Sequence, residues 1–347
     1  MWPSAEAPER GIFVQRQVEA LRALGHEVEV APLGDLRTGR LATPRKYLRL
    51  ARDARARVKS FQPDVVHAHF LVPTGSVARV AAGRAGVPYV VTAHGTDVQN
   101  ASASTGRLRG QTAAVLNDAA AIIAVSGELA ARVREIAPDA TVHVAHMGVD
   151  TTLYAPSGDP DAAANDVGWS VEGSAPRFLA VGSLLANKNH RRLIEAVATL
   201  QSGNLALVGA GPMEAHLRDH AVQLGIADRV TFVGRVAPAD LARWYNAAHV
   251  VALPSINEGF GVAALEGLAC GRPVVVSQSA PVAQLVDDTT GAVVDPLDVA
   301  SIAAGLSAAA RLAPPLDAAV ALAGAHDVEH CARTVAGFLE AGARNPG

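Results

Sequence analysis

The chain has 347 residues, 50% of them hydrophobic, with 33 acidic side chains, 30 lysine or arginine side chains and a net charge of −3. This length is enough for two domains, each with its own core. The balanced charge gives no reason to expect a nucleic-acid partner, and no apolar run approaches the roughly 18 residues that span a membrane. The opening residues lack the basic start and apolar stretch of a signal peptide, and Cys270 and Cys331 suggest no disulfide framework. We therefore expect a soluble protein of the cytoplasm.

Short apolar runs typical of strands alternate with helical patterns through the first half of the chain. They lie at residues 28–30, 65–67, 89–92, 122–125 and 142–144. This alternation favours an α/β domain with a doubly wound parallel sheet and helices on both faces.

The strand that should precede the first helix is missing from this pattern. Val14, Val18, Leu21 and Leu24 give a helical repeat that ends at Gly25, yet no apolar run comes before it. The first strand of a doubly wound sheet is usually central, so the pattern predicts a gap in the middle of the first domain. We hypothesise that the natural protein begins several residues upstream or that this copy is truncated.

Residues 45–61 predict an amphipathic helix. Its apolar face carries Tyr47, Leu50, Ala51, Ala54, Val58 and Phe61. Its other face carries Arg45, Arg49, Arg52, Arg55 and Lys59, with Lys46 and Arg57 nearby. A solvated helix surface is the favoured interpretation, because charge runs are usually only that. The alternative is peripheral contact with an anionic membrane, or attraction of an acidic acceptor, through residues 45–59.

The second half of the chain repeats the strand pattern after a polar stretch that ends near residue 176. Apolar runs lie at residues 178–182, 205–209, 230–234, 250–253 and 274–276. We expect a first domain at residues 1–155, a second at residues 156–325, and a C-terminal helix in residues 326–347 that packs back toward the first. A ligand crevice is expected where the strands end.

Residues 254–266 set two carboxylates seven residues apart across a glycine-rich turn that opens a helix. Glu258 falls in the loop and Glu266 on the helix, with Gly259 and Gly261 between them. Unpaired N–H groups and a partial positive charge at such a helix start favour a diphosphate. The two glutamates can accept hydrogen bonds from sugar hydroxyls on either side of the diphosphate. This stretch therefore predicts a binding site for an activated sugar.

These motifs together resemble the family 4 glycosyltransferases, whose GT-B fold has two Rossmann-like doubly wound parallel-sheet domains facing across a cleft. The resemblance covers nearly the whole chain except the opening strand. The matching segments besides the glutamates are residues 25–28, 67–69, 92–97, 148–150, 209–212 and 269–275. Two departures are Met147, where an asparagine is common, and residues 280–284, where relatives carry paired glycines and a glutamate.

The resemblance implies a donor site in the second domain. It implies that Glu258, with Gly259 and the backbone of Phe260 and Gly261, faces the donor sugar, and that Glu266 accepts hydrogen bonds from the ribose. Lys188 matches the family's lysine that neutralises the leaving diphosphate. Charge appears on that leaving group in the transition state, and a fixed cation stabilises such charge best. The family's arginine after the strand glycine, here Gly182, is replaced by Ser183. Arg191 and Arg192 are candidate substitutes or plain surface residues.

The resemblance assigns further residues to binding. His94 would approach the donor sugar as a catalytic residue, with a buried, satisfied histidine as the alternative. Asp97 would fix its loop or contact the acceptor. We expect the backbone to approach the donor at a glycine loop at Gly11, ahead of the first helix, and at the loop of Gly211. At the turn of Val236, backbone groups would hydrogen-bond to the base of the nucleotide.

Metal and cofactor sites are not expected. His67 and His69 share one face of a strand, but no third ligand lies close in sequence and enzymes of this fold typically need no divalent cation. Glu214 occupies the third glycine position of a dinucleotide fingerprint, so NAD is rejected.

The resemblance thus implies a bacterial, retaining glycosyltransferase that moves a hexosyl group from a nucleotide-diphosphate sugar to a hydroxyl of a sugar, lipid-linked or natural-product acceptor. One alternative is a GT-B sugar-nucleotide epimerase or disaccharide phosphorylase, which incubation with donor alone would reveal. Another is a non-catalytic sugar-nucleotide-binding partner, suggested by Ser183 and the missing strand.

Overall fold

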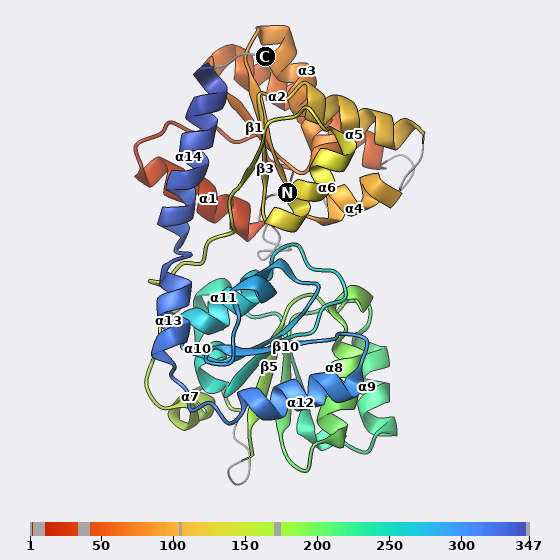
Figure 1. The fold of residues 1–347 in the computed structure, drawn as a ribbon, viewed down its shortest axis with the longest axis vertical. Helices are drawn as coiled ribbons and strands as arrows, with labels where there is room; N and C mark the ends of the chain where they lie inside the picture. The colour runs from red at the N-terminus through yellow and green to blue at the C-terminus, as the bar shows by residue number, and fades with distance from the viewer. Residues whose placement is uncertain (1, 3–10, 34–41, 104–105, 170–174, 345–347) are drawn as a thin grey trace. The chain divides into compact units, whose positions relative to one another are not determined.

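The computed structural model describes residue 2 and residues 11–33, 42–103, 106–169 and 175–344. The chain divides into two compact units (Figure 1). The first comprises residues 1–147 together with 328–347, and the second residues 148–327. The sequence placed these boundaries at residues 155 and 325. Within the described residues, no helix is both long and apolar enough to cross a membrane.

The first unit has a parallel sheet in the order β1-β2-β3-β4. Its strands are β1 (Val66–His69), β2 (Tyr89–Ala93), β3 (Ala121–Ala124) and β4 (Val142–Val144). Its helices are α1 (Ile12–Ala23), α2 (Ala42–Phe61), α3 (Ser76–Ala85), α4 (Thr96–Ala103), α5 (Arg107–Asn117), α6 (Gly127–Ile136) and α14 (Val328–Arg344), with a turn η1 (Leu71–Gly75) after β1. α14, the last helix of the chain, lies beside α1, the first (Figure 1).

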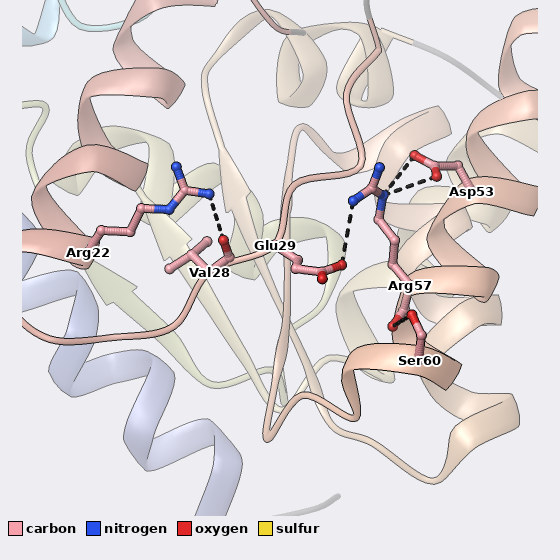
Figure 2. A network of polar contacts seen from close by, with 6 residues as sticks. All are labelled: Arg22, Val28, Glu29, Asp53, Arg57 and Ser60. Carbon is pink, nitrogen blue, oxygen red and sulfur yellow. Dashed lines mark hydrogen bonds and ion pairs between the residues drawn. The ribbon is translucent and has the colours of Figure 1, made fainter.

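The predicted strand at residues 28–30 is wrong, because these residues form no strand in the structure. A short extended run needs a neighbouring strand to satisfy its backbone groups, and the described residues provide none beside it. Side chains hold the segment instead (Figure 2). Arg22 Nη2 on α1 donates to the carbonyl oxygen of Val28 at 2.6 Å, and Arg57 on α2 lies 3.4 Å from the Glu29 carboxylate.

The predicted amphipathic helix is present as α2. Leu50 and Val58 are buried, whereas Arg45, Arg49, Arg52, Arg55 and Lys59 are exposed. Arg57 differs from that exposed set because it is half-buried and also binds Asp53 at 3.0 Å. The basic row is therefore exposed, as both interpretations require, and membrane contact stays a prediction.

The second unit has a six-stranded parallel sheet in the order β10-β9-β8-β5-β6-β7. Its strands are β5 (Arg177–Val181), β6 (Asn204–Val208), β7 (Val230–Gly234), β8 (Val250–Leu253), β9 (Val274–Ser277) and β10 (Gly291–Val294). Its helices are α7 (Pro160–Asp166), α8 (His190–Thr199), α9 (Glu214–Gln223), α10 (Pro238–Ala247), α11 (Val262–Ala269), α12 (Val299–Ala309) and α13 (Asp317–Gly324), with short turns η2 (Ala186–Lys188), η3 (Ala227–Arg229) and η4 (Pro281–Leu285).

The strand order of the second unit creates a switch point between β5 and β8. The chain leaves β5 toward β6 on one side, and leaves β8 toward β9 on the other. Loops that diverge in this way open a crevice at the carboxyl ends of the two strands, which is where ligands bind in open α/β sheets. Fully buried strand residues such as Leu205, Val250 and Val275 fix this edge of the sheet against the helices.

Candidate functional site

The loops that follow β5 and β8 are joined by an ion pair at the switch point. Lys188 Nζ lies 2.7 Å from Glu258 Oε2, and the side chains are 21% and 12% exposed. Ser255 Oγ donates to the same carboxylate oxygen at 3.1 Å, and the amide of Gly259 donates to the other at 3.1 Å. The structure thus brings together two residues that the sequence assigned to the donor site.

The two asparagines that flank Lys188 fix its position. Asn187 donates to the carbonyl oxygen of Asn257 at 3.1 Å. Asn189 is buried in the left-handed region, with φ of 59°, and its amide donates to the carbonyl oxygens of Pro254 and Pro296. These contacts tie the turn after β5 to the loop after β8, so the protein itself holds the lysine in place.

Gly261 shapes the start of α11. Its φ is 109°, a left-handed value that favours glycine, and a Cβ there would lie 2.6 Å from Val282 Cγ1. The amide of Val282 donates to the carbonyl oxygen of Phe260 at 3.0 Å. Residues 280–284, which depart from the family pattern, thus contact the turn at residues 259–261 through Val282 of η4.

Glu266 is buried on α11, at 7% exposure. The hydroxyl of Tyr245, on α10, donates to its Oε2 at 2.7 Å. Burial, followed by the nearby Glu266 carboxylate, raises the pKa of Tyr245 well above its ordinary value. The tyrosine therefore stays protonated as a donor, and it orients the carboxylate.

The glycines of the loop after β6 are required by close backbone packing. A Cβ on Gly209 would lie 2.0 Å from the carbonyl oxygen of Gly182, and one on Gly211 would lie 2.4 Å from that of Leu184. The amide of Leu184 donates to Ala210 at 3.1 Å. Gly209 thus allows close packing against Gly182, and Gly211 against Leu184, and this packing accounts for both glycines without a dinucleotide.

The remaining candidates of the second unit lie at the surface. The Ser183 side chain is exposed and Val236 is half-buried after β7. Arg191 is 68% exposed and pairs with Glu195 at 3.1 Å. Arg192 donates to Asn189 Oδ1 at 3.1 Å, so of the two arginines it is the one tied to the Lys188 turn.

In the first unit, His94 follows β2 and belongs to a histidine cluster. Its Nε2 lies 3.0 Å from His69 Nδ1, and its ring packs against Phe13 and Phe70. His67 Nε2 lies 2.7 Å from Thr92 Oγ1. Burial lowers the pKa of His67 to about 4 and that of His94 to about 3. His94 is therefore a neutral imidazole that can exchange hydrogen bonds.

Asp97 fixes the loop that carries His94. Its carboxylate accepts hydrogen bonds from the amides of Leu71, His94 and Val98, at 3.0, 3.1 and 3.0 Å. Burial raises its pKa. Gly11 is buried at the start of α1 with φ of 77°, and its carbonyl oxygen accepts from the amide of Val14. In the described part of the chain, no cluster of three or more His, Cys, Asp or Glu could hold a metal ion.

Sequence reasoning missed Ser255, Asn187, Asn189, Tyr245 and the pairing of His69 with His94. The two asparagines flank Lys188, so a turn signal was present. Tyr245 lies 21 residues before Glu266 on another helix, and no sequence pattern links residues that meet only through packing.

Two family models match the chain. The model described as Glycosyltransferase Family 4 matches residues 11–153, and the model described as Glycosyl transferases group 1 matches residues 175–311. Among curated proteins, the D-inositol 3-phosphate glycosyltransferase of Mycobacteroides abscessus is 35% identical over 248 residues, which are 67% of this chain and 55% of that protein. The chain thus spans about half the length of the first curated relatives it matches.

Solved structures match the fold over most of the chain. Sucrose-phosphate synthase from Thermosynechococcus elongatus matches with a TM-score of 0.80 and 22% identity, over 96% of this chain and 93% of that one. Anabaena HepE in complex with UDP-glucose matches with a TM-score of 0.70 and 21% identity, over 84% of this chain and 82% of that one. The predicted architecture of two Rossmann-like parallel-sheet domains, of the GT-B type, is confirmed.

Proposed function

Since the chain belongs to the family 4, group 1 glycosyltransferases, we propose that it transfers a hexosyl group from a nucleotide-diphosphate sugar to an acceptor hydroxyl with retention of configuration. The observation that carries the proposal is the Lys188–Glu258 pair at the switch point of the second unit, beside the start of α11. A cation, a carboxylate and a helix start suit a diphosphate and a sugar at adjacent positions.

The chemistry assigns a role to each group. The bond from the anomeric carbon to the diphosphate oxygen breaks, and negative charge develops on the leaving diphosphate. Lys188 stabilises that charge, which is larger in the transition state than in the bound donor. The acceptor hydroxyl attacks the same face, and its proton passes to a leaving phosphate oxygen. Positioning and electrostatics therefore account for most of the protein's contribution.

Binding of the donor is assigned to the carboxylates. Glu258 accepts hydrogen bonds from sugar hydroxyls through lone pairs left after its contacts with Lys188, Ser255 and Gly259. Glu266, oriented by Tyr245, accepts from the ribose. His94, a neutral imidazole of the first unit, is proposed to hydrogen-bond a substrate hydroxyl. No step needs a metal ion, so activity should survive excess chelator.

The first donor and acceptor to test come from the relatives. HepE is solved in complex with UDP-glucose, which makes uridine diphosphate sugars the first donors to screen. The mycobacterial relative is named for inositol 3-phosphate, which makes an inositol phosphate the first acceptor. A ligand that binds only the native state raises its stability, so a thermal-shift screen of UDP, GDP, dTDP and ADP sugars would choose the donor.

The test is product formation with the chosen donor, followed by NMR of the new glycosidic bond. We expect a product that depends on the acceptor and keeps the anomeric configuration of the donor. An inverted product would contradict retention. An epimerised donor formed without acceptor would favour the isomerase, and tight nucleotide binding without turnover across the acceptor panel would favour a non-catalytic binding protein.

A further inference from the structure

Three histidines of the first unit lie along one face of its sheet. His67 and His69 alternate along β1, and the parallel register sets His69 opposite Thr92 of β2. Side chains two residues apart in a strand lie on the same face, so His94, two residues after Thr92, comes beside His69. Its Nε2 is 3.0 Å from His69 Nδ1, whereas Nε2 of His67 lies 2.7 Å from the hydroxyl oxygen of Thr92. His69 is therefore the histidine that is hydrogen-bonded to His94.

Both rings of this pair are neutral. Burial lowers the pKa of His94 to about 3 and that of His69 well below its ordinary value. A neutral imidazole has one N–H donor and one bare acceptor nitrogen, so the pair has two possible arrangements. Either both rings carry their proton on Nε2 and His94 donates, or both carry it on Nδ1 and His69 donates.

The first arrangement uses the tautomer that each ring prefers by itself. A neutral histidine side chain without a partner favours the proton on Nε2, the ring nitrogen further from the backbone. His94 then donates from Nε2 to His69, and its Nδ1 keeps a lone pair. The hydrogen bond to His69 thus leaves Nδ1 of His94, which has no hydrogen-bond partner among the described residues, as the nitrogen that meets a ligand.

Aromatic rings also hold the imidazole of His94. The ring of Phe13 packs against it with centroids 5.0 Å apart, and the ring of Phe70 at 4.5 Å. Phe70 has φ of 70°, which is unfavourable for a bulky residue, and its carbonyl oxygen accepts from Thr74 Oγ1 at 2.9 Å. A strained residue that its surroundings hold in place is typical of a functional site. The backbone directly after His69 thus keeps an aromatic ring against His94.

We propose that His69 is a positioning residue for the transfer reaction, which fixes His94 with its proton on Nε2 so that Nδ1 accepts a hydrogen bond from a substrate hydroxyl. The inference rests on the proposed function for the presence of that hydroxyl, whereas the tautomer is a property of the free protein. A fixed lone pair selects a ligand group that donates. It therefore favours a hydroxyl over an ether oxygen at the same place.

The tautomer is measured directly by ¹⁵N–¹H correlation of the histidine rings in the labelled full chain at neutral pH. A ring nitrogen that carries a proton and one that does not have well-separated ¹⁵N shifts, and the signals of His94 are identified by their loss in His94→Gln. We expect His94 of the wild type to carry its proton on Nε2. A proton on Nδ1, or on both nitrogens, would overturn the proposal. This measurement needs no turnover, so it separates a wrong tautomer from a wrong reaction.

Substitution of His69 tests its effect on the reaction. His69→Leu removes the acceptor, so His94 should show a mixture of both tautomers and kcat/KM should fall about tenfold, as for one lost hydrogen bond. His69→Asn returns an acceptor oxygen near the place of Nδ1 and should restore most of this loss. His67→Leu is the matched control, because His67 is a neutral ring on the same face that pairs with Thr92 instead. It should change kcat/KM less than about threefold.

A double variant shows whether His69 acts through His94. In a His94→Leu background, His69→Leu should change kcat/KM less than about twofold, because a positioning residue has no effect once the residue that it positions is gone. A further loss of about tenfold in that background would overturn the proposal. Equal losses for His67→Leu and His69→Leu in the wild-type background would overturn it as well.

Discussion

Lys188 Nζ and Glu258 Oε2 lie 2.7 Å apart across the switch point of the second unit, on loops that are 70 residues apart in sequence. Both side chains are mostly buried, and Asn187 and Asn189 fix the lysine side of the pair. A cation held in place by contacts of the protein itself does not have to be reorganised when charge develops on a leaving group.

Lys188→Gln should lower kcat/KM about 100-fold, in the range found when one charge-stabilising group is removed from an active site. The measurement is initial rate against donor concentration. Arg191→Gln is the matched control, because Arg191 lies three residues away but is exposed and paired with Glu195. Similar losses in the two variants would show that the effect is general electrostatics rather than the positioned lysine.

Tyr245→Phe should raise the donor KM about tenfold and leave kcat nearly unchanged. The change removes the hydroxyl that orients Glu266, and a lost hydrogen bond to a buried charged group is worth about 1.5–3 kcal/mol. Tyr89→Phe is the control. It deletes another buried hydroxyl, which donates to Val115 in the first unit at 2.6 Å, and should lower stability without raising the donor KM. Equal KM values in both variants would contradict the assignment of Glu266.

Gly209→Ala should destabilise the second unit by about 2–4 kcal/mol, because the new Cβ would lie 2.0 Å from the carbonyl oxygen of Gly182. Denaturant unfolding with nucleotide titration would measure both the stability and the expected loss of donor affinity. Gly225→Ala is the control, because Gly225 also has a positive φ but no atom lies within 4 Å of its Cβ position. It measures the cost of backbone strain without a steric clash. A loss of stability in Gly209→Ala no larger than that in Gly225→Ala would contradict the packing argument.

The histidine cluster predicts a loss of stability in acid. The pKa of His67 falls to about 4 and that of His94 to about 3 in the folded chain, both through burial, while an unfolded histidine titrates near 6.5. The unfolded state therefore binds more protons between these values, so the free energy of unfolding should decrease as pH falls from about 6.5 toward 4. Unfolding midpoints measured between about pH 6.5 and 4 test this expected decrease.

His94→Gln removes one titrating ring and should make that decrease shallower by about 1.4 kcal/mol per pH unit. A pH profile that is flat in the wild type, or equally steep in the variant, would contradict the burial of a neutral His94.

The parallel sheets and the donor loop could be predicted from the sequence because their signals are local. Residues 250–253 form an apolar run bounded by Pro254, and the structure has β8 there. Glu258 was indicated by the glycine-rich helix start, whereas Lys188 came from the family resemblance. The structure places both after neighbouring strands at the switch point. The same local reasoning failed at residues 28–30, where the apolar pattern is correct but the neighbouring strand is lacking in the described chain.

The fine geometry of the site could not be predicted, because it depends on packing between distant segments. Tyr245 reaches Glu266 through the contact of α10 with α11. Position 209 requires a glycine because the backbone of Gly182, in a different loop, lies too close to leave room for a Cβ. The β10 strand was also missed in the sequence analysis.

The central claim is tested most directly by acceptor-dependent release of nucleoside diphosphate from the donor, measured for the wild type and for Glu258→Gln. We predict that the wild type releases the diphosphate only with acceptor present. Glu258→Gln should lower this rate at least about 100-fold while nucleotide affinity changes less than about tenfold, because the amide keeps the shape of the loop. Equal rates in the two proteins, or release that does not depend on the acceptor, would contradict the claim.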